Sequence, residues 1–220
     1  MENLEFIRFK ANGNGPLTDQ VINCYRNVFG GEPWNEWKRC QKCDRKFGIE
    51  QLADGKTHCC NMPLVDFWPK EVVQRDIFNE ISGDASCWLS VVKENDNVVD
   101  VVGFSWGYPI TPKNLEDMVK FSGIVDIITD IFGHMECVAY QDEIGLATKY
   151  RGQKIGRAMQ LLTHQDYTKQ GLGVVVARTK TNPPTVAYHW YKKAGMDVIG
   201  EYGDEDGRVI MAGRTNNLSF

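Results

Sequence analysis

The fold is decided by residues 143–157, which read EIGLATKYRGQKIGR. The chain from Tyr140 to Thr148 has the apolar, β-compatible character of the end of a strand. A turn with Arg151 and Gly152 follows, and from Ile155 onward apolar residues recur near a period of 3.6. That period is typical of a helix. The stretch therefore predicts a strand, a glycine-bearing turn and a helix, in that order.

Such a connection points several free backbone N–H groups at one spot. The spot lies at the positive end of the helix dipole and suits an anion, most obviously a phosphate. Arg151, Lys154 and Arg157 add positive charge beside it. An ordinary strand–helix connection, whose glycines only satisfy the backbone geometry, accounts for the same residues. The rest of the chain has to decide between the two interpretations.

The composition indicates a folded protein with a core. The chain has 220 residues, of which 42% are hydrophobic and 11% aromatic, and it has no low-complexity tract. This length suits one large domain or one domain with a small module. The net charge of -4 argues against a nucleic-acid-binding protein, because such proteins usually have a basic surface.

No apolar run is long enough to span a bilayer, and residues 1–10 lack the pattern of a signal peptide. We therefore expect a soluble, cytoplasmic protein without a membrane partner. The chain has seven cysteines. Without a secretion signal, they indicate reduced thiols or metal ligands and not disulfides.

Periodicity and turn residues predict the remaining elements. Strands are expected at residues 4–10, 87–93, 98–108, 136–148, 173–179, 196–201 and 208–212. Helices are expected from a cap at Thr18 or Asp19 to residue 29, and at 69–80, 115–132 with a break at Gly123, 155–170 and 185–194. This order is not the strict alternation of a doubly wound fold. It predicts an α+β fold in which a mixed sheet lies between helices, in α/β/α layers.

Residues 150–158, YRGQKIGRA, resemble the acyl-CoA pyrophosphate loop of the GNAT N-acetyltransferase superfamily. Arg151 and Gly156 match the first and last positions of the family pattern. Lys154 stands where an inner glycine is usual. A non-glycine residue there leaves the N–H groups of the turn available.

A second match begins at Asn182 and continues through residues 187–196, AYHWYKKAGM, with Met196 in place of the usual phenylalanine. Two matches in the family's order are more specific than either one alone. The resemblance implies one GNAT acetyltransferase domain over residues 1–220, with a mixed, mostly antiparallel sheet. It also implies acetyl-CoA as cosubstrate and direct transfer of the acetyl group to a primary amine of a small molecule or peptide.

The resemblance further implies how the cofactor is held. Backbone N–H groups of the loop would hold the CoA pyrophosphate, the end of the central strand would pair with the pantetheine arm, and the N–H near Ile144 would polarise the acetyl carbonyl. For Asn182, a role as a turn residue and helix cap is the alternative. The expected cofactor-binding residues are Ile144, Gly145, Leu146, Arg151, Gly152, Gln153, Lys154, Ile155, Gly156, Arg157 and Asn182.

The resemblance places Tyr191 where the family has its general acid, next to the departing CoA sulfur. Without the family, a tyrosine at helical spacing from Tyr188 is more typical of a core. For the general base, Glu143 is preferred because it directly precedes the acetyl-contact position, with Asp142 and then Glu136 as alternatives. Strand alternation puts Asp142 and Glu143 on opposite faces, so only one of them can face the cleft.

Residues 38–66 form an insertion within the domain that is too small to build a hydrophobic core. The segment contains Cys40, Cys43, Cys59 and Cys60. A tetrahedral Zn²⁺ bound by these four thiolates would hold the segment together as a structural site. His58 could replace one of the cysteines, and a set of free buried thiols is the alternative.

The sequence thus predicts an acetyl-CoA-dependent N-acetyltransferase with a structural zinc site. A second hypothesis is a catalytically inactive, GNAT-like, zinc-containing adaptor that binds a protein or RNA partner. Lys154 and the basic segment 38–46 favour this second hypothesis. Members of the family often dimerise, so a homodimer is compatible with the resemblance. The sequence does not identify the acceptor amine.

Overall fold

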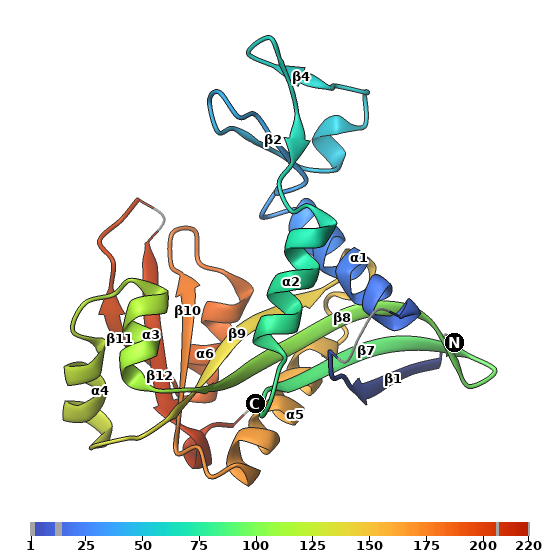
Figure 1. Ribbon diagram of the computed structural model, residues 1–220. Helices are drawn as coiled ribbons and strands as arrows, with labels where there is room; N and C mark the ends of the chain where they lie inside the picture. The colour runs from blue at the N-terminus through green and yellow to red at the C-terminus, as the bar shows by residue number, and fades with distance from the viewer. Residues whose placement is uncertain (1–2, 12–14, 206, 220) are drawn as a thin grey trace. The chain divides into compact units, whose positions relative to one another are not determined.

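The computed structural model describes residues 3–11, 15–205 and 207–219. The chain divides into two compact units, whose elements are labelled in Figure 1. The first unit contains Met1–Ser82, Trp88–Ser105 and Ile144–Met159, and the second contains Gly83–Cys87, Trp106–Glu143 and Gln160–Phe220. The expectation of one domain over residues 1–220 with an insertion at 38–66 stays a prediction.

Seven strands form one sheet in the order β1-β7-β8-β9-β10-β12-β11. The strands are β1 (Asn3–Arg8), β7 (Ser86–Glu94), β8 (Asn97–Ile110), β9 (Val138–Leu146), β10 (Val174–Lys180), β11 (Asp197–Glu201) and β12 (Arg208–Arg214). The β9–β10 pair is parallel, whereas the β1–β7, β10–β12 and β11–β12 pairs are antiparallel. The predicted α+β fold with a mixed, mostly antiparallel sheet is confirmed.

In the second unit, helices cover both faces of the sheet. The helices that contribute are α3 (Pro112–Val119), α4 (Ile124–Phe132), α5 (Ile155–Lys169) and α6 (Val186–Ala194). Val176 and its neighbours on one face pack against α3 and α4, and Val175 on the other face packs against α5 and α6. Side chains alternate between the faces of a strand, so these adjacent valines belong to separate cores. The result is the predicted arrangement of helix, sheet and helix.

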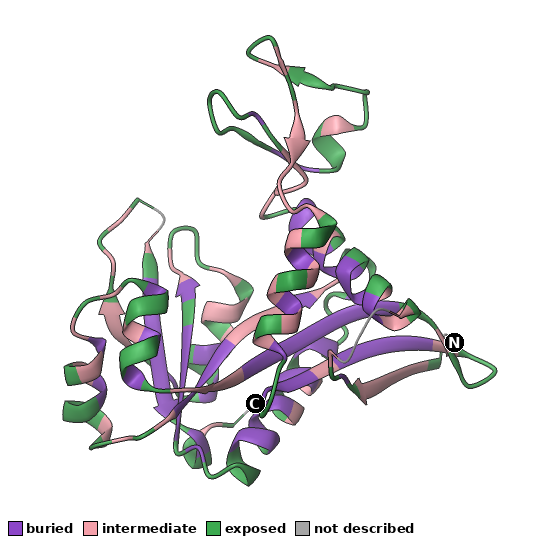
Figure 2. Cartoon of the chain, in the orientation of Figure 1, coloured by how far each residue is buried: buried purple, intermediate pink, exposed green. Residues whose placement is uncertain are grey.

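The first unit is built around the aromatic face of helix α1 (Pro16–Gly30) and helix α2 (Lys70–Glu80). The ring of Tyr25 in α1 stacks on Phe104 of β8 at 5.6 Å between centroids. In another cluster, Val92 and Val102 pack with Ile155 at the start of α5. Figure 2 shows strands β7 and β8 of this unit as largely buried.

The predicted cap of α1 was wrong. The helix begins at Pro16, and its N-cap residue is Gly15, which has no side chain to accept a hydrogen bond. Neither Thr18 nor Asp19 is therefore the cap. Proline is favoured at the first helical position because its missing N–H would lack a helical partner there in any case. The predicted break at Gly123 is confirmed, since α3 ends before it and α4 begins after it. Across the described residues, we find no helix with the length and apolarity needed to cross a membrane.

The cysteine-rich insertion continues the first unit between α1 and α2, and consists of short pieces (Figure 1). Strands β2 (Lys38–Arg39), β3 (Lys46–Phe47) and β6 (Val65–Asp66) form one small sheet. Strands β4 (His58–Cys59) and β5 (Met62–Pro63) form a second, and η1 (Glu50–Leu52) is a single 3₁₀ turn. Cys40 and Phe47 are its buried hydrophobic residues, so apolar burial contributes little to its stability.

Candidate active site and metal centre

Strand β9 pairs with β10 over only part of its length. The parallel pairing runs from Ala139 to Gln141 and ends at the pair Ala177–Gln141. Both strands continue beyond that pair, β9 to Leu146 and β10 to Lys180. Among the described residues, we find no pairing of β9 with β10 beyond Gln141. Backbone groups on that side of β9 can pair with an extended ligand, as an added strand would.

The loop between β9 and α5 presents a row of backbone donors. After η2 (Thr148–Tyr150), the chain turns at Arg151 and enters α5 at Ile155. Among the described residues, we find no hydrogen-bond partner for the backbone N–H groups from Gly152 to Arg157. These groups lie at the positive end of α5. Their arrangement suits a bound phosphate.

Arg151 is held within the loop by its own hydrogen bonds. Its Nε donates to the carbonyl oxygen of Leu146 and its Nη1 to that of Glu32, both at 3.0 Å. Its backbone N–H donates to Thr148, so the free N–H groups of the loop begin at Gly152. The guanidinium group therefore braces the turn. Lys154 of the loop and Arg157 in the first turn of α5 are both exposed.

Lys154 adopts a backbone conformation that favours glycine. Its φ is +65°, and that of Gly152 is +79°. A lysine in this left-handed region brings Cβ close to the backbone, at a cost of about 1 kcal/mol. A glycine would adopt this conformation without strain, so the lysine keeps the turn at some cost in stability.

Tyr191 lies in the core of the second unit. Helix α6 begins after Thr185, whose side chain accepts a hydrogen bond from the backbone N–H of Tyr188. Tyr191 is 3% exposed and packs in the same cluster as Tyr167 of α5. Burial first, and then the negative charges of Glu143 and Asp142, raise the pKa of Tyr191 above its usual range. The phenol is therefore protonated at neutral pH.

Asp142 and Glu143 are adjacent residues of β9, so strand alternation places their side chains on opposite faces of the sheet. The hydroxyl group of Tyr108 donates a hydrogen bond to Asp142 Oδ2, with 3.0 Å between the two oxygen atoms. Burial raises the pKa of Asp142 to about 6, although the Tyr108 hydrogen bond and the charge of Arg178 oppose the shift. Glu136, the third candidate base, lies before the start of β9 and thus at the end remote from Ile144.

Asn182 lies in an exposed turn of the second unit. Its Nδ2 donates to the carbonyl oxygen of Glu205 at 3.2 Å. The N-cap of α6 is Thr185, so the alternative role of Asn182 as a helix cap was wrong. This hydrogen bond links the turn at Asn182 to the segment that precedes β12.

A buried group of polar side chains around Gln141 was not predicted from the sequence. Gln141 is 1% exposed, and its Nε2 donates to the carbonyl oxygens of Trp106 at 2.9 Å and Glu143 at 3.1 Å. Its Oε1 accepts from Gln160 Nε2 at 3.1 Å and from the Tyr167 hydroxyl at 3.2 Å. The signal in the sequence was a single glutamine directly after the apolar run 138–140. A partner for it cannot be read from local pattern.

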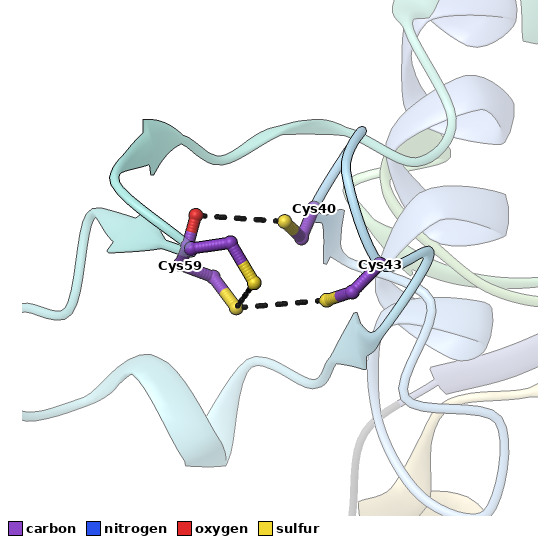
Figure 3. Close-up of side chains that lie close together, drawn as sticks. Cys40, Cys43 and Cys59 are labelled. Carbon is purple, nitrogen blue, oxygen red and sulfur yellow. Dashed lines mark hydrogen bonds between the residues drawn. The ribbon is translucent and has the colours of Figure 1, made fainter.

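The four predicted metal ligands come together in the insertion, and Figure 3 labels three of them, Cys40, Cys43 and Cys59. Their sulfur atoms all lie within 4.8 Å of one another. Cys43 Sγ is 3.8 Å from Cys59 Sγ, which is 3.7 Å from Cys60 Sγ. Tetrahedral zinc with Zn–S bonds of about 2.3 Å places sulfur atoms about 3.8 Å apart, whereas a disulfide would need about 2.0 Å. The spacing fits four thiolates around one metal ion.

Cys40 and Cys60 have different hydrogen-bond partners, and the pKa values of their thiols shift in opposite directions. Backbone hydrogen bonds, chiefly from Cys43 and then from Lys42, lower the pKa of Cys40 to about 7. The neighbouring thiols Cys43 and Cys59 raise the pKa of Cys60 to about 12. His58 lies outside the group of four sulfurs, and its Nδ1 is 2.9 Å from Thr57 Oγ1.

The seven-stranded sheet and its helices have the fold of the GNAT acetyltransferases. NAA60 of Arabidopsis thaliana, solved with acetyl-CoA, is 14% identical, with a TM-score of 0.58 over 97% of this chain and 99% of that one. The PaiA N-acetyltransferase of Thermoplasma acidophilum, solved with coenzyme A, is 14% identical, with a TM-score of 0.53 over 96% and 99%.

A chain of the NatC complex, solved with a Gag peptide and CoA, is 9% identical, with a TM-score of 0.56 over 96% of this chain and 98% of that one. No protein-family model and no curated protein matches the sequence. At these identities the likeness establishes the fold, and the activity has to be argued from the residues themselves.

Proposed function

We propose that this protein is an acetyl-CoA-dependent N-acetyltransferase that moves the acetyl group directly to a primary amine. The observation that carries the proposal is the path of β9. The pairing of β9 with β10 ends at Gln141, and β9 itself continues to Leu146. After η2 follow the backbone N–H groups of Gly152–Arg157, for which we find no partner among the described residues. An unpaired strand edge followed by an anion-binding helix start suits a ligand with an amide-bearing arm and a pyrophosphate.

In this proposal the cofactor extends along the chain from Ile144 to Arg157. The pantetheine amides pair with the backbone from Ile144 to Leu146, and the Ile144 N–H donates to the acetyl carbonyl. The pyrophosphate accepts hydrogen bonds from the N–H groups of the loop, while the exposed Lys154 and Arg157 side chains supply positive charge. Asn182 contributes an amide contact to the CoA arm.

The acetyl group is transferred in one attack. Glu143 accepts a proton from the amine, and the neutral nitrogen attacks the thioester carbon, so that a C–N bond forms and the C–S bond breaks. Tyr191 donates its phenolic proton to the departing CoA thiolate, and the proton that the nitrogen loses as it becomes an amide restores the phenol. Glu143 is preferred to Asp142 because it shares the strand face of Gln141, whose partner Tyr167 packs in the same cluster as Tyr191.

We propose a peptide N-terminus or a small amine as the acceptor. The NatC structure contains a Gag peptide, a second NAA60 structure contains a bisubstrate analogue, and another similar structure is a mosquito arylalkylamine N-acetyltransferase-like protein. These names support an amine as the proposed acceptor, and a peptide N-terminus and a small amine are both tested below.

We further propose that Cys40, Cys43, Cys59 and Cys60 bind one structural Zn²⁺. Four mutually close sulfurs in a segment with almost no buried apolar side chain are the donor set that tetrahedral zinc prefers. Four protein ligands leave no position for a substrate or water. The ion would fix the fold of the insertion and take no part in acetyl transfer.

A panel of amines tests the proposed activity. The purified protein is incubated with acetyl-CoA and peptides with free N-termini, arylalkylamines, polyamines or aminoglycosides, and the products are identified by mass spectrometry. We expect an acetylated product from at least one amine, with stoichiometric release of CoA. Acetyl-CoA binding without acetylation of any of these amines would instead favour the adaptor hypothesis.

A further inference from the structure

Gln141 makes hydrogen bonds that bear directly on the proposed chemistry. We infer that Gln141 is a positioning residue that fixes the peptide group between Glu143 and Ile144, so that the Ile144 N–H is aimed at the acetyl carbonyl. The inference rests on the proposed function, because it assumes that acetyl-CoA lies along β9.

The orientation of the Gln141 amide is determined by its partners. Two backbone carbonyls, those of Trp106 and Glu143, can only accept hydrogen bonds, so the NH₂ group must face them. The carbonyl end of the amide faces the donors of Gln160 and Tyr167. Both ends are thus satisfied in a side chain that is 1% exposed, and a buried amide satisfied at both ends cannot rotate without breaking these hydrogen bonds.

The same hydrogen bonds set the direction of the next N–H. The C=O and N–H of a trans peptide point in opposite directions, and the Glu143–Ile144 bond is not among the cis peptides. Because the Glu143 carbonyl points at Gln141 Nε2, the N–H of the same peptide points away from it. Gln141 Nε2 also binds Trp106 of β8, so the N–H is directed away from β8.

Strand β8 borders one side of β9, and β10 borders the other. The pairing with β10 has already ended at Gln141 when the chain reaches Glu143. The N–H of the Glu143–Ile144 peptide is therefore presented on the side of β9 that lacks a strand partner. An extended thioester ligand on this side would meet a donor held in place before it binds, and donors held in this way stabilise the developing oxyanion of acyl transfer.

The surroundings of Gln141 leave little room for movement. Gln160 and Tyr167, which hold its Oε1, are both 0% exposed and belong to α5. Gly107 of β8 lies so close that a Cβ there would collide with the Tyr167 hydroxyl and the Tyr140 carbonyl. The close approach of β8, β9 and α5 therefore requires a glycine at this position, and it confines the Gln141 side chain.

Infrared spectroscopy of bound acetyl-CoA tests this role without requiring an acceptor. Acetyl-CoA labelled with ¹³C at the thioester carbonyl is bound to the wild type and to Gln141→Met, which has a similar volume but no donor. A hydrogen bond lowers the carbonyl stretching frequency. We expect a lower frequency on the wild type than in water, and a return toward the free value on Gln141→Met.

Turnover and binding complete the test. We expect Gln141→Met to lower kcat by about 100-fold, the scale of one lost oxyanion donor, while CoA without the acetyl group binds as to the wild type. Gln165→Met, an exposed glutamine of the same helix that holds Gln141, is the matched control and should change neither quantity. A Gln141→Met protein with wild-type frequency and kcat would overturn the inference, and Gln141 would then be a purely structural residue.

A second variant decides the matter if Gln141→Met does not fold. Tyr167→Phe removes one of the two donors to Gln141 Oε1 and keeps the ring in the core. We expect a smaller frequency change in the same direction, and an unchanged frequency would contradict the inference. Failure of the wild type to bind acetyl-CoA at all would instead remove the proposed function, and the positioning role with it.

Discussion

The hydroxyl of Tyr108 donates a hydrogen bond to Asp142 Oδ2 at 3.0 Å, on the face of β9 opposite to Gln141. The two residues come from neighbouring strands of the sheet. Asp142 is thereby tied to the sheet as a partly buried carboxyl group, while its neighbour Glu143 faces the side of α5 and α6. Because the two carboxyl groups lie on opposite faces of β9, substitutions of Asp142 and of Glu143 can test their roles separately.

Asp142 gives the protein a stability that depends on pH. Burial raises the pKa of Asp142 from 3.8 to about 6, so between these values the folded state keeps a proton that the unfolded state has lost. The free energy of unfolding therefore falls as pH rises from about 4 to about 6. We expect the free energy of unfolding of Asp142→Asn to decrease less than that of the wild type over this pH range. Urea unfolding at several pH values measures it. Parallel curves for the two proteins would contradict the assignment.

Removal of the Tyr108 hydroxyl should raise the pKa of Asp142 further, because a donor to a carboxylate favours its charged form. In Tyr108→Phe we expect the Asp142 titration, followed by ¹³C NMR of the side-chain carboxyl group, to move to higher pH. A downward shift for Asp142 would show that the hydroxyl does not stabilise the carboxylate.

Tyr191→Phe should slow acetyl transfer without weakening cofactor binding. Loss of a general acid costs about 100-fold or more in kcat, whereas the phenyl ring still fills the core of the second unit. The measurement is kcat with the best amine of the panel, together with the Kd of acetyl-CoA. Tyr188→Phe on the same helix is the control. Equal turnover in Tyr191→Phe and the wild type would remove Tyr191 from the acid role.

The fold could be predicted from the sequence because its two sequence motifs are short stretches of the chain. The turn at Arg151 and the helix that ends at Gly195 each depend on residues close together in the chain. Strand order is different, because the insertion of β12 between β10 and β11 depends on pairings that no local pattern contains. For the same reason, the unpaired end of β9 was expected only through the resemblance and not from the local pattern.

The cysteine site was predictable from composition, because a segment with four thiols and no hydrophobic core needs a metal ion or a similar cross-link to hold it together. Gln141 was not predictable in this way. Its importance comes from Trp106, Gln160 and Tyr167, which are remote in sequence and meet only in the folded sheet. Thr18 and Asp19 are residue types that often cap helices, but α1 already begins at Pro16 because proline is favoured at the first helical position.

The left-handed conformation of Lys154 predicts opposite effects of two substitutions. Lys154→Gly fits φ = +65° without strain, so we expect acetyl-CoA affinity to remain within about threefold of wild type. Lys154→Pro fixes φ near −65° and removes one loop N–H, so we expect an affinity loss of at least about tenfold. Calorimetry gives both values. Equal affinity in the two variants would show that this turn does not hold the cofactor.

Zinc binding should depend on the cysteine cluster and not on the remaining cysteines. We expect about one equivalent of zinc in protein purified without added metal, and a loss of zinc and a lower Tm in Cys43→Ser. Cys137→Ser, outside the cluster, is the control and should retain the metal. Plasma mass spectrometry measures the zinc content. Metal-free wild-type protein with an unchanged Tm in Cys43→Ser would contradict the structural zinc site.

The central claim is that the loop from Gly152 to Arg157 binds the pyrophosphate of acetyl-CoA. Titration calorimetry of the purified protein with acetyl-CoA tests it most directly, with adenosine as the ligand that lacks the pyrophosphate. We expect saturable 1:1 binding of acetyl-CoA that weakens as salt is raised, and far weaker binding of adenosine. Absence of detectable acetyl-CoA binding at millimolar ligand would contradict the account.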